Sequence, residues 1–261
     1  MINVLATEVL KARRSRVPWI TALAFTVAAA VGGLFMFILQ DQDQDRARSL
    51  GLIGTKAALV GRDADWPTYL GFLAQTTAVG GMLVFGMVSV WLFGREFSQN
   101  TVKDLLALPS ARTTIVLAKF AVAGAWCLVL TVQLVVLGLG IGAVLGLPRW
   151  SADLATSGVA TIAVTAVMTV LLTTPVALAA SAGRGYLPGV GVLMAAIFSA
   201  QVVAALGYGR YFPWSVPALF SGLAGPDAGS PGWLGVVLVV LVGAAGVAAT
   251  ALWWRNADQD R

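Results

Sequence analysis

The sequence predicts an all-α polytopic membrane protein with six transmembrane helices and both termini in the cytoplasm. Only 11% of the 261 residues are charged, whereas a soluble domain has about a quarter of its residues charged. The charges gather in short islands, and between them lie six charge-free stretches of 24 residues or more. A helix that crosses a bilayer needs roughly 20 apolar residues, so each stretch can hold one span.

The distribution of lysine and arginine sets the orientation. With the N-terminus inside, the expected cytoplasmic islands hold eleven Lys and Arg residues, against six in the expected outer islands. Cytoplasmic loops of membrane proteins carry such an excess of positive charge. Retention of positive loops at the anionic inner face of the lipid bilayer accounts for the formal net charge of +5, so no nucleic-acid partner is expected.

The first element is a short amphipathic helix in cytoplasmic residues 1–17. Ile2, Leu5 and Val9 share one face of it, so it should lie in the membrane interface. The apolar run that follows is longer than that of a signal peptide and has no Ala-x-Ala site behind it. We therefore expect this run to be retained as the first span, 18–39.

An outer loop, residues 40–68, follows the first span and is too polar to insert. Asp41, Asp43 and Asp45 have the spacing that opens a calcium-binding loop, but the glycine and glutamate of that loop are absent. We expect a solvated loop and no metal site. The chain has no histidine and a single cysteine, Cys127, which argues against histidine catalysis, zinc sites and an internal disulfide.

Five further spans complete the predicted bundle. They are 69–93, 114–145, 155–182, 187–206 and 233–254, followed by a cytoplasmic tail at 255–261. The outer segment 207–232 is unusually apolar, and its prolines prevent one continuous helix. It should form short re-entrant or interfacial helices against the outer ends of the bundle.

Polar residues inside the spans suggest a candidate substrate path. In the fourth span a threonine recurs every four residues and forms a seam on one face: Thr161, Thr165, Thr169 and Thr173. Gln75 and Gln133 are further candidates. Helix packing is the open alternative, because threonines also bond their own backbone or a neighbouring helix. Pro175 should kink or open the helix next to the seam.

The cytoplasmic segment 94–113 carries the main functional prediction. Thr101 can cap a helix, with Asp104 as the partner in a capping box, and Pro109 ends that helix. Its seven residues would span only about 10 Å. A helix this short is not stable alone in water, so something must support it.

This short helix would present an apolar knob with a polar flank. The knob consists of Val102, Leu105 and Leu106, and the flank of Lys103 and Asp104. Such a knob at a membrane surface suits a socket on a partner protein. From the residues alone, an ordinary interfacial hairpin between two spans is an equal alternative.

The segment resembles the loop between the second and third spans of ABC-2-type transporter permeases. The pattern Glu-x4-Thr-x3-Leu-Leu-x2-Pro-x2-Arg is met by Glu96, Thr101, Leu105, Leu106, Pro109 and Arg112, with Asn100 where the family often has glycine. The outer motif Phe-Pro-Trp-Ser-Val-Pro at 212–217 is similar to the five–six loop of the bacitracin- and lantibiotic-resistance branch.

This resemblance implies a type V, ABC-2 exporter-like fold, in which the short helix is a coupling helix that docks on a separate ABC ATPase subunit. It also implies two permease chains, identical or different, in a bacterial inner or plasma membrane, with ATP and Mg held by the ATPase. The chain has no Gly-x4-Gly-Lys-Ser/Thr phosphate loop, so we expect no enzyme and no cofactor in it. The expected substrate is an amphiphile such as a peptide antibiotic, a drug or a lipid.

Several alternatives stay open. Glu96 could pair with Arg95, with Arg112 or with the partner, and could serve a helix end or transmission. A secondary transporter or channel would need ionisable residues at mid-span, and none lies there. A membrane scaffold or sensor without transport is a third hypothesis. A membrane enzyme would need paired acids, or a nucleophile with a base, in a span, and no span of this sequence carries them.

Overall fold

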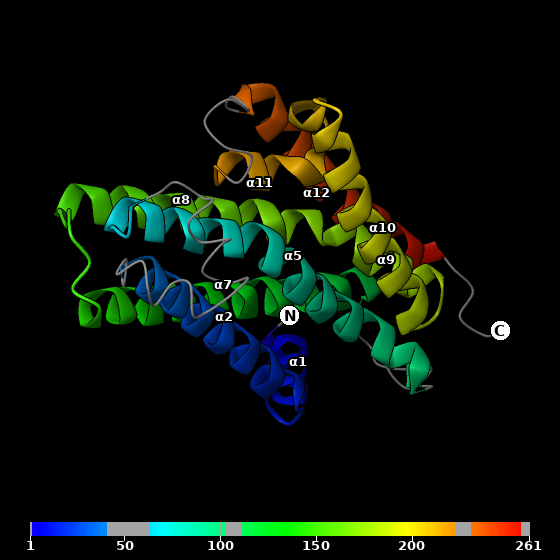
Figure 1. The fold of residues 1–261 in the computed structure, drawn as a ribbon. Coiled ribbons are helices and arrows are strands. Elements are labelled where there is room, and N and C mark those ends of the chain that lie inside the picture. Colours follow the sequence, from blue (N-terminus) through cyan, green and yellow to red (C-terminus); the bar gives the residue numbers. More distant parts are fainter. Residues whose placement is uncertain (1, 41–62, 100, 103–110, 223–230, 257–261) are drawn as a thin grey trace.

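The structure, a computed structural model, describes residues 2–40, 63–99, 101–102, 111–222 and 231–256 (Figure 1). Within these residues every regular element is a helix. Some predicted features lie outside the described residues: the acidic run at 41–45, and Lys103, Asp104, Leu105, Leu106 and Pro109 of the segment between the second and third spans.

Six helices in the described part of the chain are long and apolar enough to cross a membrane. They are α2 (Val17–Gln40), α5 (Trp66–Ser98), α7 (Arg112–Val144), the pair α8 (Ala152–Leu172) and α9 (Thr174–Ala182), α10 (Tyr186–Ala205) and α12 (Gly232–Asn256). A short helix, α1 (Ile2–Arg13), precedes them, and η1 (Gly209–Tyr211), η2 (Pro213–Ser215) and α11 (Val216–Phe220) lie between α10 and α12. The predicted all-helical fold with six spans is confirmed.

The second span, α5, is the central helix of the bundle. It packs against α2, α7, α8, α9 and α10, and Figure 1 shows it passing between these helices. Leu73, Phe85 and Phe93 on it are fully buried. A helix that is apolar all round is buried in the protein interior, which explains why the sequence of α5 shows no polar face.

The sequence predicts that the second span ends at residue 93, whereas the helix α5 continues to Ser98. Its last turn finds partners inside the protein. The ring of Phe97 lies 5.7 Å from the ring of Trp253 and 5.7 Å from that of Trp254, both at the end of α12. Glu96 therefore lies within the helix and not in a connecting loop.

The fourth span is divided next to Pro175, as the sequence predicts. Pro175 has no N–H to bond the carbonyl of Leu171, but Thr174 Oγ1 lies 2.9 Å from that oxygen. The carbonyl of Leu172 accepts a 3.3 Å hydrogen bond from Trp214 Nε1. The Trp214 indole thus replaces one of the helical hydrogen bonds that the break removes, while the Thr174 hydroxyl shares its single proton between the carbonyls of Leu171 and Gly243.

An outer clasp joins the ends of α2 and α5 to the corner between α7 and α8. Gln40 Nε2 donates to the carbonyl of Leu145 at 3.2 Å. The guanidinium of Arg149 bonds Asp65 at 2.7 Å and Asp63 at 2.9 Å. Arg149 has φ 64°, a backbone conformation that costs energy in a residue with a side chain, and the two carboxylates hold it there.

Both ends of the described chain lie at the end of the bundle where α7 begins. Lys119, near the start of α7, contacts Glu8 on α1. Arg112, at the start of α7, contacts the carbonyl of Trp254 near the end of α12. An even number of spans places the two ends of the chain on the same side of the membrane. The charge bias predicts that this side is cytoplasmic.

Candidate functional site

A buried group of charged side chains lies where α5 ends and α7 begins. We call Glu8, Lys11, Glu96, Lys119 and Thr101 the ion cluster. The side chain of Lys119 is 0% exposed, and those of Glu8 and Glu96 are 1% exposed. Charges this deeply buried are stable only when they are paired and hydrogen-bonded.

Lys119 is the centre of the ion cluster. Its ammonium donates to Glu96 Oε1 at 2.9 Å, to Glu8 Oε2 at 3.0 Å and to the carbonyl of Leu92 at 3.1 Å. An ammonium has three N–H donors, so all three are used. Lys119 points inward because it shares the buried face of α7 with Ile115 and Val122.

Lys11 on α1 completes the charge balance. Its ammonium lies 3.3 Å from Glu8 Oε1 and 3.2 Å from Glu96 Oε1. The side chain is 28% exposed, so these pairs are more solvated than those of Lys119. Two carboxylates thus meet two ammonium groups, and Arg95 Nε lies farther out, 3.9 Å from Glu96 Oε1.

The second oxygen of Glu96 holds Thr101, which follows the C-terminal end of α5. Glu96 Oε2 accepts a 2.6 Å hydrogen bond from Thr101 Oγ1, and the Thr101 N–H donates to the Glu96 carbonyl at 2.9 Å. Val102 beside it is buried. Two of the predicted coupling residues, Glu96 and Thr101, are therefore brought together.

Arg112 does not join the ion cluster. Its Nη1 lies 3.4 Å from the carbonyl of Trp254 and 3.5 Å from that of Arg255. A cation is favourable at the C-terminus of a helix, here that of α12. The possible pairing of Glu96 with Arg112 is therefore wrong, because the guanidinium is directed at α12.

Sequence reasoning missed Glu8 and Lys119 as the partners of Glu96. The sequence places Glu8 in an interfacial helix, and its partner Lys119 is 111 residues away along the chain. One signal was available. The chain has only two glutamates, and a lysine on the inward face of an apolar helix needs acidic partners.

The threonine seam of the fourth span is mostly enclosed within this chain. Thr165, Thr169 and Thr173 are buried, whereas the hydroxyl of Thr161 is exposed and donates to its own helix. Thr169 Oγ1 donates to the carbonyl of Thr165 at 2.7 Å. Ser89 on α5 donates to Thr173 Oγ1 at 3.0 Å, so this hydrogen bond joins two helices.

The two glutamines predicted for the path lie on different helices. Gln133 Nε2 donates to the carbonyl of Ala22 at 3.0 Å and to Thr26 Oγ1 at 2.8 Å, which joins α7 to α2. Gln75 is partly buried on α5. Neither glutamine, and none of the four seam threonines, is among the residues that line the pocket described next.

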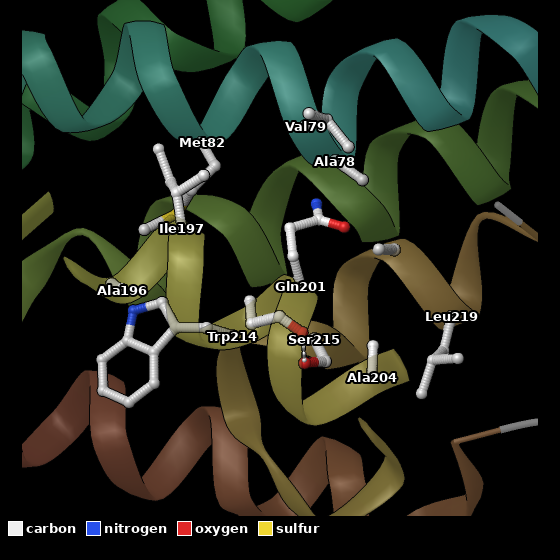
Figure 2. A pocket seen from close by; sticks show the side chains of 12 residues that line it. Ala78, Val79, Met82, Ala196, Ile197, Gln201, Ala204, Trp214, Ser215 and Leu219 are labelled. Carbon is white, nitrogen blue, oxygen red and sulfur yellow. Dashed lines mark hydrogen bonds between the residues drawn. The ribbon is translucent and has the colours of Figure 1, made fainter. Parts of the chain in front are cut away.

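A pocket of about 200 Å³ opens between α5, α10 and the η2–α11 segment (Figure 2). Small side chains leave the space: Ala78 on α5, Ala196, Ala200 and Ala204 on α10, and Ala218 on α11. Figure 2 shows Gln201 projecting from α10 into this space. The pocket is not evident from the sequence, because its walls come from three separate segments.

The polar groups of the pocket differ in what they can still bind. The indole N–H of Trp214 is directed to the carbonyl of Leu172, and Ser215 Oγ donates to the carbonyl of Ala200 at 2.9 Å. The side chain of Gln201 is exposed and offers both donors and acceptors. An apolar cavity with a few placed polar groups is typical of small-molecule sites.

Comparison with known proteins adds a family. The sequence profile of a family described as "ABC-2 family transporter protein" matches residues 4–200. The chain is also similar to the bacitracin transport permease protein of Bacillus licheniformis. The two are 24% identical over 179 residues, which cover 68% of this chain and 85% of that protein. No solved structure matches the chain.

Proposed function

Because the chain belongs to the ABC-2 family of transporter proteins, we propose that it is the permease subunit of an exporter driven by a separate ATP-binding subunit. It is a multi-pass membrane protein with six spans in its described part, and its bacterial relative fits a bacterial plasma membrane. ATP and Mg would bind to the partner subunit, and this chain would supply the transport path.

One observation carries the proposal of ATP coupling. The coupling segment, residues 94–113, has its two flanks fixed to different spans. On one side Thr101 bonds Glu96, whose carboxylate also bonds Lys119 on α7. On the other side Arg112 lies against the end of α12. A force applied to this segment from the cytoplasm would therefore act on α5, α7 and α12 together.

We assign docking of the ATPase to the centre of the coupling segment. The residues proposed to contact it are Lys103, Asp104, Leu105, Leu106 and Pro109, whereas Val102, which the sequence places in the apolar knob, is buried within this chain. The family resemblance supports an assembly of two permease chains with two ATPase subunits. Closure of the ATPase pair on ATP would move the two coupling segments and change the access of a path between the permease chains.

We propose that the substrate is an amphiphile and that the pocket receives its apolar part. The alanines of α10 leave room for an apolar group, and Gln201 can hydrogen-bond a polar one. A peptide antibiotic, a drug or a lipid has this composition, and the named relative is a bacitracin transport permease. The buried threonines then serve helix packing, since Thr165 and Thr169 are enclosed.

The coupling is tested by purifying the tagged chain together with the ATP-binding subunit from membranes of its source cell, and by measuring ATP hydrolysis after reconstitution. The substitutions Leu105→Asp and Leu106→Asp should abolish association, because they place two charges on the apolar knob. Ala152→Asp and Thr156→Asp, two exposed positions at the opposite end of the bundle, serve as the matched control and should leave association unchanged.

Two results would refute this function. An ATP-binding subunit that fails to co-purify, or a Leu105→Asp/Leu106→Asp chain that still associates and hydrolyses ATP, would remove the coupling. Substrate movement driven by an ion gradient without ATP would favour a secondary transporter. For the substrate, bacitracin is the first probe: cells that express the intact complex should tolerate more of it than cells with the double variant.

A further inference from the structure

The helix α1 carries a buried carboxylate that is bonded to the bundle. Glu8 is directed into the protein, and its two oxygens accept from Lys119 and Lys11. Val4 and Ala12 of α1 pack against the core, whereas Leu5, Val9 and Leu10 are 37%, 41% and 49% exposed. The position of α1 on the bundle therefore depends on the Glu8 carboxylate together with these apolar contacts.

Lys119 connects this carboxylate to a second one. The same ammonium donates to Glu8 Oε2 at 3.0 Å and to Glu96 Oε1 at 2.9 Å. Its third donor is fixed on the carbonyl of Leu92. Because the site is buried, bulk water cannot readily replace an acceptor that Lys119 loses. A change at Glu8 must therefore alter how Lys119 holds Glu96.

Glu96 passes this constraint to the coupling segment. Its other oxygen accepts the 2.6 Å hydrogen bond of Thr101 Oγ1. The Thr101 N–H is bonded to the main-chain carbonyl of the same glutamate. The orientation of the Glu96 carboxylate thus helps to place Thr101, where the coupling segment begins beyond α5.

We propose that Glu8 is a positioning residue for the coupling segment and acts on it through Lys119 and Glu96. The helix α1 and the coupling segment are then the two ends of one polar relay, Glu8–Lys119–Glu96–Thr101. A displacement of α1 at the membrane surface changes how the segment meets its partner. The effect on Thr101 can be measured in this chain without a partner, whereas the effect on transport rests on the proposed function.

The relay is tested first on the purified permease without any ATPase. The measurement is the exchange rate of the Thr101 amide hydrogen, which reports the opening of its bond to Glu96. Glu8→Gln keeps the shape of the side chain and removes its charge, so this amide should exchange on the order of tenfold faster. Arg13→Gln, which removes a charge from the exposed side of the same helix, is the matched control and should change nothing there.

This measurement separates positioning from simple anchoring. If Glu8 only anchors α1, Glu8→Gln speeds exchange within α1 and leaves the Thr101 amide unchanged, and the proposal is overturned. Glu8→Asp provides a second variant in case the glutamine variant does not fold. It keeps the charge but retracts it by one methylene, and it should speed Thr101 exchange by a smaller factor.

The second stage uses the assembled complex. If the wild-type complex hydrolyses ATP and moves substrate, Glu8→Gln should leave association intact and lower the substrate moved per ATP at least several-fold, with Glu8→Asp in between. An unchanged ratio would overturn the role of the relay in transport. If the wild-type complex does not form, the proposed function fails. The exchange rate of the Thr101 amide still decides whether Glu8 positions Thr101, because that measurement needs no ATPase.

Discussion

Trp214 donates its indole N–H to the carbonyl of Leu172 at 3.3 Å, so the segment between α10 and α12 is bonded to the break in the fourth span. Trp214 also forms part of the pocket wall. One residue therefore links the pocket to the division between α8 and α9. The shape of the pocket should depend on that division being intact.

The substitution Trp214→Phe tests this link. Phenylalanine keeps most of the wall but removes the N–H, so the Leu172 carbonyl loses its partner. We expect a loss of stability of about 1–3 kcal/mol, measured by equilibrium unfolding in mixed micelles. Trp19→Phe, at a strongly exposed position, should be neutral, and equal losses in both variants would contradict the assigned hydrogen bond.

A second prediction concerns the approach of α12 to this break. A Cβ at Gly246 would lie 2.8 Å from Pro175 N and from the carbonyl carbon of Thr174, which are backbone atoms and cannot rotate away. Gly246→Ala should therefore destabilise the protein by about 1–3 kcal/mol, measured by the same unfolding assay.

Gly140 on α7 is the matched control, because a Cβ there meets nothing within 4 Å. Gly140→Ala should be neutral, or stabilising by up to about 1 kcal/mol, since alanine favours helix over glycine. If Gly246→Ala behaved like the Gly140 variant, α12 could not lie as close to Thr174 as described.

The ion cluster predicts unequal roles for its two lysines. Lys119→Met removes the fully buried cation and leaves two carboxylates without their main partner, which should cost about 3–5 kcal/mol. Lys11→Met removes a partly exposed cation with longer contacts, and should cost about 1 kcal/mol or less. The two variants are compared by unfolding in the same micelles, and similar losses would show that Lys119 is not the centre of the cluster.

The pocket can be filled without touching the coupling segment. Ala200→Phe places a ring in the space beside Gln201, so it should abolish protection against the transported compound while ATPase association is retained. Ala195→Phe, on the exposed side of the same helix, provides the comparison. Growth in bacitracin and co-purification are the two measurements, and unimpaired protection in the Ala200 variant would exclude the pocket from the path.

The parts of the fold that the sequence predicted depend on composition and local chemistry. Long charge-free runs located the six spans, and Pro175 located the division in the fourth one. The sequence predicts an earlier end for α5 than the structure shows, because the last turn, with Phe97 and Ser98, is supported by Trp253 and Trp254 on α12. No local sequence pattern predicts a contact between residues that lie so far apart along the chain.

The candidate site was predicted less completely for the same reason. The pattern from Glu96 to Arg112 predicts a site at the end of α5 and the start of α7, but the partners of Glu96 come from α1 and α7. A charge pair between distant helices is decided by packing, and Arg112 was as plausible a partner by sign and spacing as Lys119. The sequence does not predict the pocket for a similar reason: the alanines line a cavity only because three separate segments pack together there.

The outer clasp has a practical consequence for the long segment between α2 and α5. Gln40 bonds Leu145, and Asp63 bonds Arg149, so both ends of residues 41–62 are fastened to the same corner of the bundle. The free energy of closing a loop rises only slowly with its length. An epitope or a small reporter domain inserted there should therefore leave the spans in register and provide a handle on the side opposite the proposed ATPase-docking segment.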